Sequence, residues 1–197
     1  MACAPCYNRS VKVSDPSILT PSDKKLRELA LYISDRSQAD PAFGATKLNK
    51  LLFYSDFIAY LNFGKSITGQ KYFRLNNGPA PKRWIIVQKK MCLDGDLAIK
   101  KQDYFGFPQN RPIALRKADI SRFDENEKSV IDHVIERYAS LSASEISDAS
   151  HGFIGWSLAK DKEDIPYPVS RVSKTDITDS IIKHGENLRE QAVAALG

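Results

Sequence analysis

The apolar positions of this chain are densest between residues 46 and 63, in the segment TKLNKLLFYSDFIAYLNF. At helical spacing they cover more than one face, which predicts a central helix that is buried on most of its sides. Thr46 is expected to be its N-cap and Gly64 its left-handed stop. Asn49 and Asp56 lie two turns apart on one side of it. Because an unpaired buried charge is costly, we expect Asp56 to bond a loop backbone, a lysine or a tyrosine, and we interpret both residues as structural.

Shorter apolar stripes predict further helices around this one. The first is expected to open at Pro21-Ser22, with Ser22 as its cap, and a third to open at Pro81 and end at residues 94–95. Two capping boxes, with the pattern cap-x-x-Glu, predict the starts of a fourth and a fifth helix at Asp124 and Ser142. A last amphipathic helix, from residue 175 or 176 to 196, is expected either to bind a partner or to fold back on the core.

Alternating and β-branched segments predict strands over residues 71–75, 97–107 and 112–117, the last two joined by a turn at 108–111. We expect the aromatic residues of the longer strand to cover the helices, with binding of a partner as the alternative; they are Tyr104, Phe105 and Phe107. The predicted fold is therefore α+β and mainly α: a helical core around one buried central helix, with a small antiparallel β-sheet. Within it we expect an extended arm over residues 1–20, a domain over 21–169, and a C-terminal helix or tail over 170–197.

Charge is distributed unevenly along the 197 residues, whose net charge is +5. Residues 65–117 hold twelve Lys or Arg and three Asp, a net charge of +9. Residues 119–148 hold three Lys or Arg and eight Asp or Glu, a net charge of −5. Such a division steers charged partners, and it keeps nucleic acid as an alternative partner. No apolar run is long enough to cross a bilayer and no leader pattern opens the chain, so we expect a cytoplasmic protein with no membrane contact.

Residues that could carry chemistry are few. Cys3 and Cys6 form a C-x-x-C pair without a second pair to complete a zinc site, and Cys92 is expected to be a small buried hydrophobe. The three histidines have no metal-binding spacing, and no phosphate loop or nucleophile motif occurs. We interpret His151 and Trp156 as structural. The sequence thus favours a protein that is not an enzyme and that uses no metal and no cofactor.

Three blocks of the sequence, in order and spacing, resemble the Panacea domain of SocA-like antitoxins. The first, Lys47 to Asp56, is similar to the K-L-x-K-L-L-Y-x-x-D helix of that family. The second joins Ile67-Thr68-Gly69-Gln70-Lys71-Tyr72 to Asn77-Gly78-Pro79-Ala80-Pro81, and the third runs from Leu141 through Ser150-His151 and Trp156 to Ile165-Pro166-Tyr167. Two positions depart from the family pattern: Ala80 replaces the usual valine, and Trp84-Ile85-Ile86 stands where a tyrosine is common.

The resemblance implies a mainly helical fold with a small sheet, no cofactor, and an antitoxin of a toxin–antitoxin pair, often phage-related. It implies that a cognate toxin protein is neutralised by direct binding. Two alternatives stay open: a proteolytic adaptor that carries the toxin to a protease, and a nucleic-acid-binding autoregulator.

For the partner surface we select a turn and the residues on either side of it, because loops beside a rigid helix often bind partners. The selected residues are Tyr72, Arg74, Asn77, Gly78, Pro79, Lys82 and Arg83. The alternative for Gly78 and Pro79 is that they only shape the turn.

Overall fold

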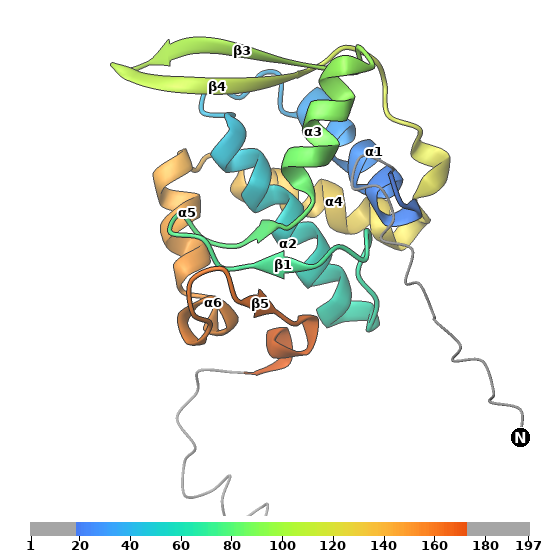
Figure 1. The fold of residues 1–197 in the computed structure, drawn as a ribbon, viewed down its shortest axis with the longest axis vertical. Helices are drawn as coiled ribbons and strands as arrows, with labels where there is room; N and C mark the ends of the chain where they lie inside the picture. Colours follow the sequence, from blue (N-terminus) through green and yellow to red (C-terminus); the bar gives the residue numbers. More distant parts are fainter. Residues whose placement is uncertain (1–18, 173–197) are drawn as a thin grey trace, which may run out of the picture.

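The computed structural model describes residues 19–172. The predictions for the N-terminal arm, for the Cys3–Cys6 pair and for the C-terminal helix lie outside these residues. Six α-helices occur in the described part, and Figure 1 shows them gathered around α2. They are α1 (Pro21–Arg36), α2 (Ala45–Phe63), α3 (Trp84–Leu93), α4 (Glu125–Tyr138), α5 (Ala143–His151) and α6 (Ile154–Leu158).

Helix α2 is the centre of the molecule. It packs against α1, α4 and α5, and against the short 3-10 helix η2 (Tyr167–Arg171). More than half of its residues are buried, among them Leu48, Leu52 and Phe53. The helix ends at Gly64, whose φ of 73° is left-handed, as the sequence predicts. The prediction of one buried central helix is confirmed.

Two small antiparallel sheets complete the fold (Figure 1). The first has the order β2-β1-β5, with β2 (Ala80–Pro81), β1 (Tyr72–Phe73) and β5 (Asp164–Ile165). The second is a hairpin of β3 (Leu97–Tyr104) and β4 (Phe107–Ala114), which extends from the helical body. With six helices and these sheets, the α+β, mainly α prediction is confirmed.

The hairpin turn differs from the prediction. Tyr104 pairs with Phe107, so the turn consists of Phe105 and Gly106, whose φ angles are 52° and 83°. Two positive φ angles give the turn type that matches the twist of a hairpin, and Gly106 provides one of them without strain. Residues 108–111, predicted as the turn, belong to β4. The sheet has only two strands, so Pro108 lies on an edge, where proline is tolerated.

Other boundaries also differ. Thr20, not Ser22, caps α1 in a capping box with Asp23, and Gly44, not Thr46, is the N-cap of α2. Pro81 belongs to β2 and pairs with Tyr72, so it does not open the third helix. The capping boxes at the starts of α4 and α5 are confirmed.

Two predictions of burial are wrong. Cys92 is exposed on α3. Phe105 and Phe107 are 85% and 72% exposed at the end of the hairpin, so they do not cover the helices. Each error has its own physical reason. Helix α3 buries only the face of Trp84, Val87 and Met91, which leaves Cys92 outside. The hairpin extends past the core, which leaves its end exposed.

Candidate functional site

Asp56 is the buried polar centre of the fold. Its carboxylate accepts hydrogen bonds from the Thr68 backbone N–H at 2.7 Å, the Thr68 hydroxyl at 2.5 Å and the Tyr72 hydroxyl at 2.8 Å. Burial raises the pKa of this carboxyl from 3.8 to about 6, although these hydrogen bonds act in the opposite direction. The network ties α2 to the segment that leads into β1, and thereby fixes the start of the turn that follows.

Two buried lysines of α2, one turn apart, have different surroundings. The Lys47 ammonium is fully partnered: Asp40 Oδ2 lies at 2.6 Å, and the carbonyls of Ala139 and Leu141 accept at 2.9 and 2.6 Å. Lys50 is 2% exposed, and its ammonium donates one long bond, 3.4 Å, to the Pro79 carbonyl. Within residues 19–172 it pairs with no carboxylate. Burial lowers the pKa of Lys50 to about 8.

The Lys50 ammonium lies directly beneath the turn at residues 76–79. A Cβ placed on Gly78 would lie 2.6 Å from Lys50 Nζ and 2.3 Å from the Ser150 hydroxyl of α5. Gly78 also has a φ of 97°. Both facts require glycine at this position, because any side chain would push the turn away from the lysine. The Ser147 hydroxyl, also on α5, donates to the Asn77 carbonyl at 2.7 Å and holds the turn from the other side.

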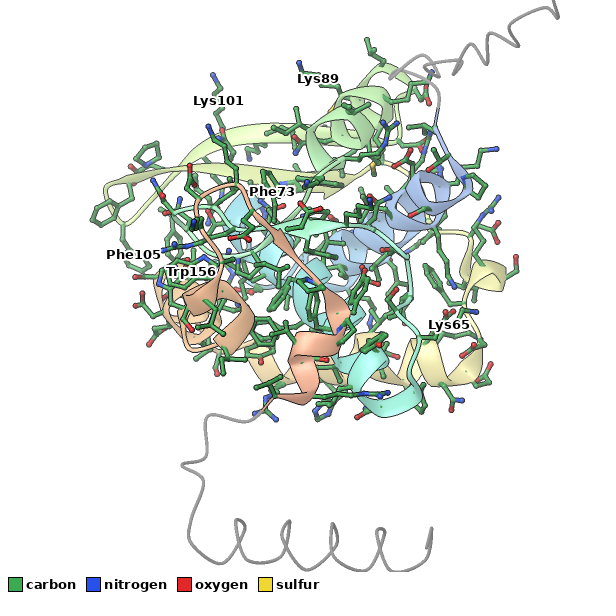
Figure 2. The ribbon with its side chains drawn as sticks, turned by 60° about the horizontal axis from the view of Figure 1, so that its bottom comes forward. Lys65, Phe73, Lys89, Lys101, Phe105 and Trp156 are labelled. Carbon is green, nitrogen blue, oxygen red and sulfur yellow. The ribbon has the colours of Figure 1, made fainter. Side chains whose placement is uncertain are left out.

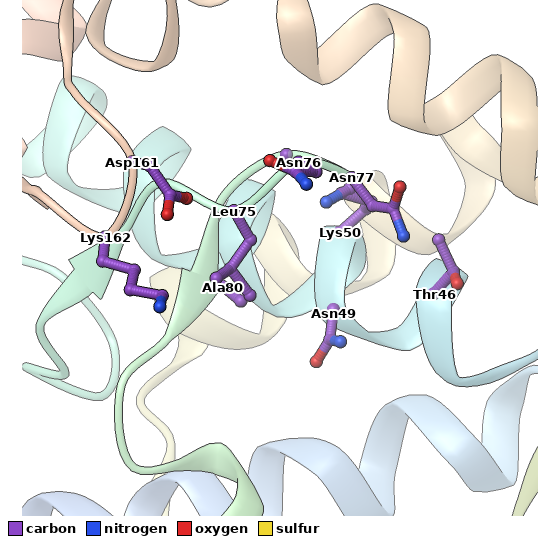
Figure 3. Close-up of a pocket in the computed structure, with 10 residues that line it drawn as sticks. Thr46, Asn49, Lys50, Leu75, Asn76, Asn77, Ala80, Asp161 and Lys162 are labelled. Atoms are coloured by element: carbon purple, nitrogen blue, oxygen red, sulfur yellow. The ribbon is translucent and has the colours of Figure 1, made fainter.

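A pocket of about 450 Å³ opens between this turn and α2 (Figure 3). Thr46, Asn49 and Lys50 contribute from α2, and the turn and the loop before β5 form the other walls. The charged groups that line it are two lysines, Lys50 and Lys162, and one carboxylate, Asp161. In the described part of the chain Asp161 forms no ion pair with either lysine. The pocket is polar, with an excess of positive charge.

A second, smaller pocket of about 200 Å³ lies next to the first, because Thr46 lines both. Its walls are the first turn of α2 and the end of the hairpin, with Tyr104 and Phe107. The Arg111 guanidinium of β4 holds the hairpin here by donating to the carbonyls of Gln38, Asp40 and Phe43 in the loop before α2. We call the two pockets and the hairpin end, residues 104–107, the α2 face.

Arg74, Trp156 and His151 form a separate stack. The Arg74 guanidinium lies 4.4 Å from the centre of the Trp156 ring, and that ring stacks on His151 at 4.0 Å. Arg74 and Trp156 also bond backbone carbonyls, of Ala159 and Leu75 respectively. Backbone carbonyls thus hold the Arg74 and Trp156 side chains, and the His151 ring packs on the Trp156 ring.

The structure does not bring the predicted partner-binding residues together: Arg74 belongs to the stack on Trp156, and the others lie at the pocket, in the core or in ion pairs outside the pocket. Asn77 and Gly78 line the larger pocket, and the Pro79 carbonyl accepts from Lys50. Tyr72 is 1% exposed, so its selection as a surface residue is wrong: its ring packs against α2 and its hydroxyl against Asp56. Lys82 pairs with Asp164 and Arg83 with Asp23, outside the pocket.

Basic residues of the 65–117 segment are largely engaged within the fold. Arg83, Arg116 and Lys117 pair with carboxylates of α1, namely Asp23, Glu28 and Asp35. Figure 2 shows Lys89 and Lys101 pointing outward, with Phe105 at the outer end of the hairpin. Five lysines of residues 65–117 have no side-chain partner within the described chain, and they are scattered along the segment; they are Lys65, Lys71, Lys89, Lys100 and Lys101. The positively charged residues of this segment therefore do not form one continuous basic surface.

Sequence reasoning missed Lys50 and Lys162, and it kept partner binding by the aromatic residues of the hairpin end only as an alternative. The sequence did indicate Lys50, since a lysine within an apolar helix has to be buried or paired. Sequence analysis used this residue only as part of the Lys47–Asp56 block that resembles the family pattern. Within residues 19–172 no group of His, Cys, Asp and Glu side chains has the arrangement that holds a metal ion. No helix of this part has the length and apolar character that a bilayer-spanning helix requires.

A central apolar helix, the Gly78 turn packed beside it and a polar pocket between them define a mainly helical scaffold with a polar binding pocket. The family described as antitoxin SocA-like, Panacea domain, matches residues 48–157, more than half of the chain. The protein belongs to this family. The match begins in α2 and ends in α6, and so includes Lys50, Asp56, Gly78 and Ser150. Comparison with curated proteins gave no match. Comparison with solved structures also gave no match.

Proposed function

We propose that this protein is an antitoxin that neutralises its cognate toxin by direct binding through the α2 face, without catalysing a reaction. Membership of the SocA-like antitoxin family supports the role. The observation that carries the binding surface is the combination of a polar pocket with exposed aromatic side chains beside it. Phe105 and Phe107 are among the most exposed large apolar residues of the described chain. Aromatic residues at the centre of an interface contribute a large share of binding energy.

The hairpin turn supports this assignment by its strain. Phe105 has a φ of 52°, in the left-handed region where a bulky side chain is unfavourable. Asparagine or glycine would suit that position better, and neither would expose a large apolar ring. A residue that is both strained and exposed is typical of a functional position.

Co-expression tests the proposal. The chain is expressed together with the product of the adjacent gene as the candidate toxin, and growth and co-purification are measured. The wild-type chain should restore growth and copurify with the toxin. Replacing Phe105 and Phe107 together by serine should abolish both effects, while Leu93→Ser, which removes an equally exposed apolar residue from α3, should preserve them. If the double serine variant still restores growth and copurifies with the toxin as well as the wild type does, the proposed surface is contradicted.

The two alternatives have separate signatures. An adaptor would shorten the lifetime of the toxin in cells that contain the protease, whereas an antitoxin that occludes its target leaves that lifetime unchanged. A nucleic-acid-binding autoregulator requires a basic surface, and the internal ion pairs of residues 65–117 reduce what is available. Its binding would fall steeply with salt.

A further inference from the structure

Among residues 19–172 the Lys50 ammonium has no counter-ion, whereas its neighbour Lys47 pairs with Asp40. The two lysines lie on one helix and are almost equally buried, at 1% and 2% exposure. Lys47 has a carboxylate and two carbonyls, whereas Lys50 has one carbonyl at 3.4 Å. A buried charge lacking partners costs free energy in the free protein, and that cost persists where function requires it.

The surroundings of Lys50 favour an anion. The first turn of α2 contains no acidic residue, and its N-cap Gly44 offers no side chain to the free N–H groups. The first turn of α2 reaches the pocket at Thr46, so the positive end of the helix dipole adds to the positive character of the pocket that Lys50 and Lys162 line. Asp161 is the one carboxylate that lines the pocket within the described residues, and it opposes two ammonium groups.

We propose that the Lys50 pocket receives an acidic side chain, Asp or Glu, of the bound toxin, whose carboxylate becomes the counter-ion of Lys50. This inference rests on the proposed function and adds to it the chemical group that the antitoxin recognises. A carboxylate is flat and small enough to reach an ammonium that is 2% exposed beneath the Gly78 turn. The amides of Asn76 and Asn77 at the pocket wall provide further donors.

The first test uses the full-length chain alone. Lysine labelled with ¹³C at Cε is titrated by NMR, with Lys50→Arg used to assign the signal. A capped glutamate should shift the Lys50 signal and raise the pKa of its amine from about 8 toward 10.5, while capped glutamine should not. A shift with inorganic phosphate but not with capped glutamate, or no shift with any of these probes, would overturn the proposal. So would a Lys50 amine that already titrates at 10.5 without a probe, because its counter-ion would then lie in its own chain.

The second test separates recognition from stability. Lys50→Met keeps the length of the side chain and removes the charge, so urea unfolding should show equal or greater stability than the wild type. Affinity for the toxin should fall about 30-fold or more, because the carboxylate of the toxin would be buried without a partner. Lys162→Met, at the exposed rim of the same pocket, should cost less than about tenfold. A Lys50→Met chain that is less stable but binds the toxin normally would show that Lys50 only supports the turn.

Refutation of carboxylate binding at the Lys50 pocket and refutation of the proposed antitoxin function give different experimental results. If the wild-type chain binds no toxin, the proposed function fails, and the titration with capped glutamate still decides whether the pocket takes a carboxylate. If the wild-type chain binds toxin and Lys50→Met binds it equally well, the function stands and the Lys50 pocket is not its acidic-residue site.

Discussion

Asp56→Asn should change the pH dependence of stability in a direction fixed by the raised pKa. The carboxyl has a pKa of about 6 in the folded chain against 3.8 ordinarily, so the folded state binds its proton more tightly than the unfolded state. The contribution of this carboxyl to stability is therefore fully present below pH 3.8 and is lost as the pH rises through about 6. A difference of about two pKa units corresponds to about 3 kcal/mol.

The assay is urea unfolding of the wild type and of Asp56→Asn at a series of pH values. The free energy of unfolding of the wild type, relative to the variant, should fall by about 3 kcal/mol between pH of about 4 and about 7 and then stay constant. Tyr72→Phe removes a hydrogen bond that lowers this pKa, so its decline should extend to higher pH. A difference between wild type and Asp56→Asn that is flat, or that rises with pH, would refute the reasoning.

Three further substitutions, and Gly95→Ala as a control, test particular contacts by urea or thermal unfolding. Gly78→Ala should lower the free energy of unfolding by about 3 kcal/mol, because the new Cβ meets Lys50 and Ser150. Gly95 also has a positive φ but open space around it, so Gly95→Ala should lower it by about 1 kcal/mol. Equal losses would contradict the packing argument. Lys47→Met should lower the free energy of unfolding by about 3–5 kcal/mol, since it leaves the Asp40 carboxylate without its ion-pair partner. An unchanged free energy of unfolding would show that the pair is dispensable. Phe105→Asn should raise stability by up to about 1 kcal/mol by relieving the strained turn, and a lower melting temperature would contradict the assigned strain.

Local patterns in the sequence predicted the parts of the fold that local physics decides. The apolar helix over residues 46–63, its stop at Gly64 and the capping boxes at Asp124 and Ser142 depend on residues within a few positions of each other. The hairpin turn was misplaced because Pro108 and Asn110 resemble turn residues, while the positive φ of Phe105 has no signal in its side chain. The register is decided by the whole strand pair.

The candidate site depends on contacts that the sequence does not show. Lys47 and Lys50 occur in nearly identical local sequence, and they differ only because Asp40 and the carbonyls after α4 approach one and not the other. Tyr72 resembled a surface residue of a short strand, yet both neighbours of that strand and α2 enclose it. The exposure of Phe105 follows from the length of the hairpin beyond the core, which is a tertiary property.

Direct titration of the purified chain with its purified cognate toxin tests the central claim, that this antitoxin-family protein acts by binding the toxin itself. Calorimetry should show saturable binding with a Kd of about a micromolar or tighter, which the paired serine substitution at Phe105 and Phe107 abolishes. Absence of binding between the purified proteins, while the chain still protects cells from the toxin, would contradict the claim and place the action of the protein elsewhere.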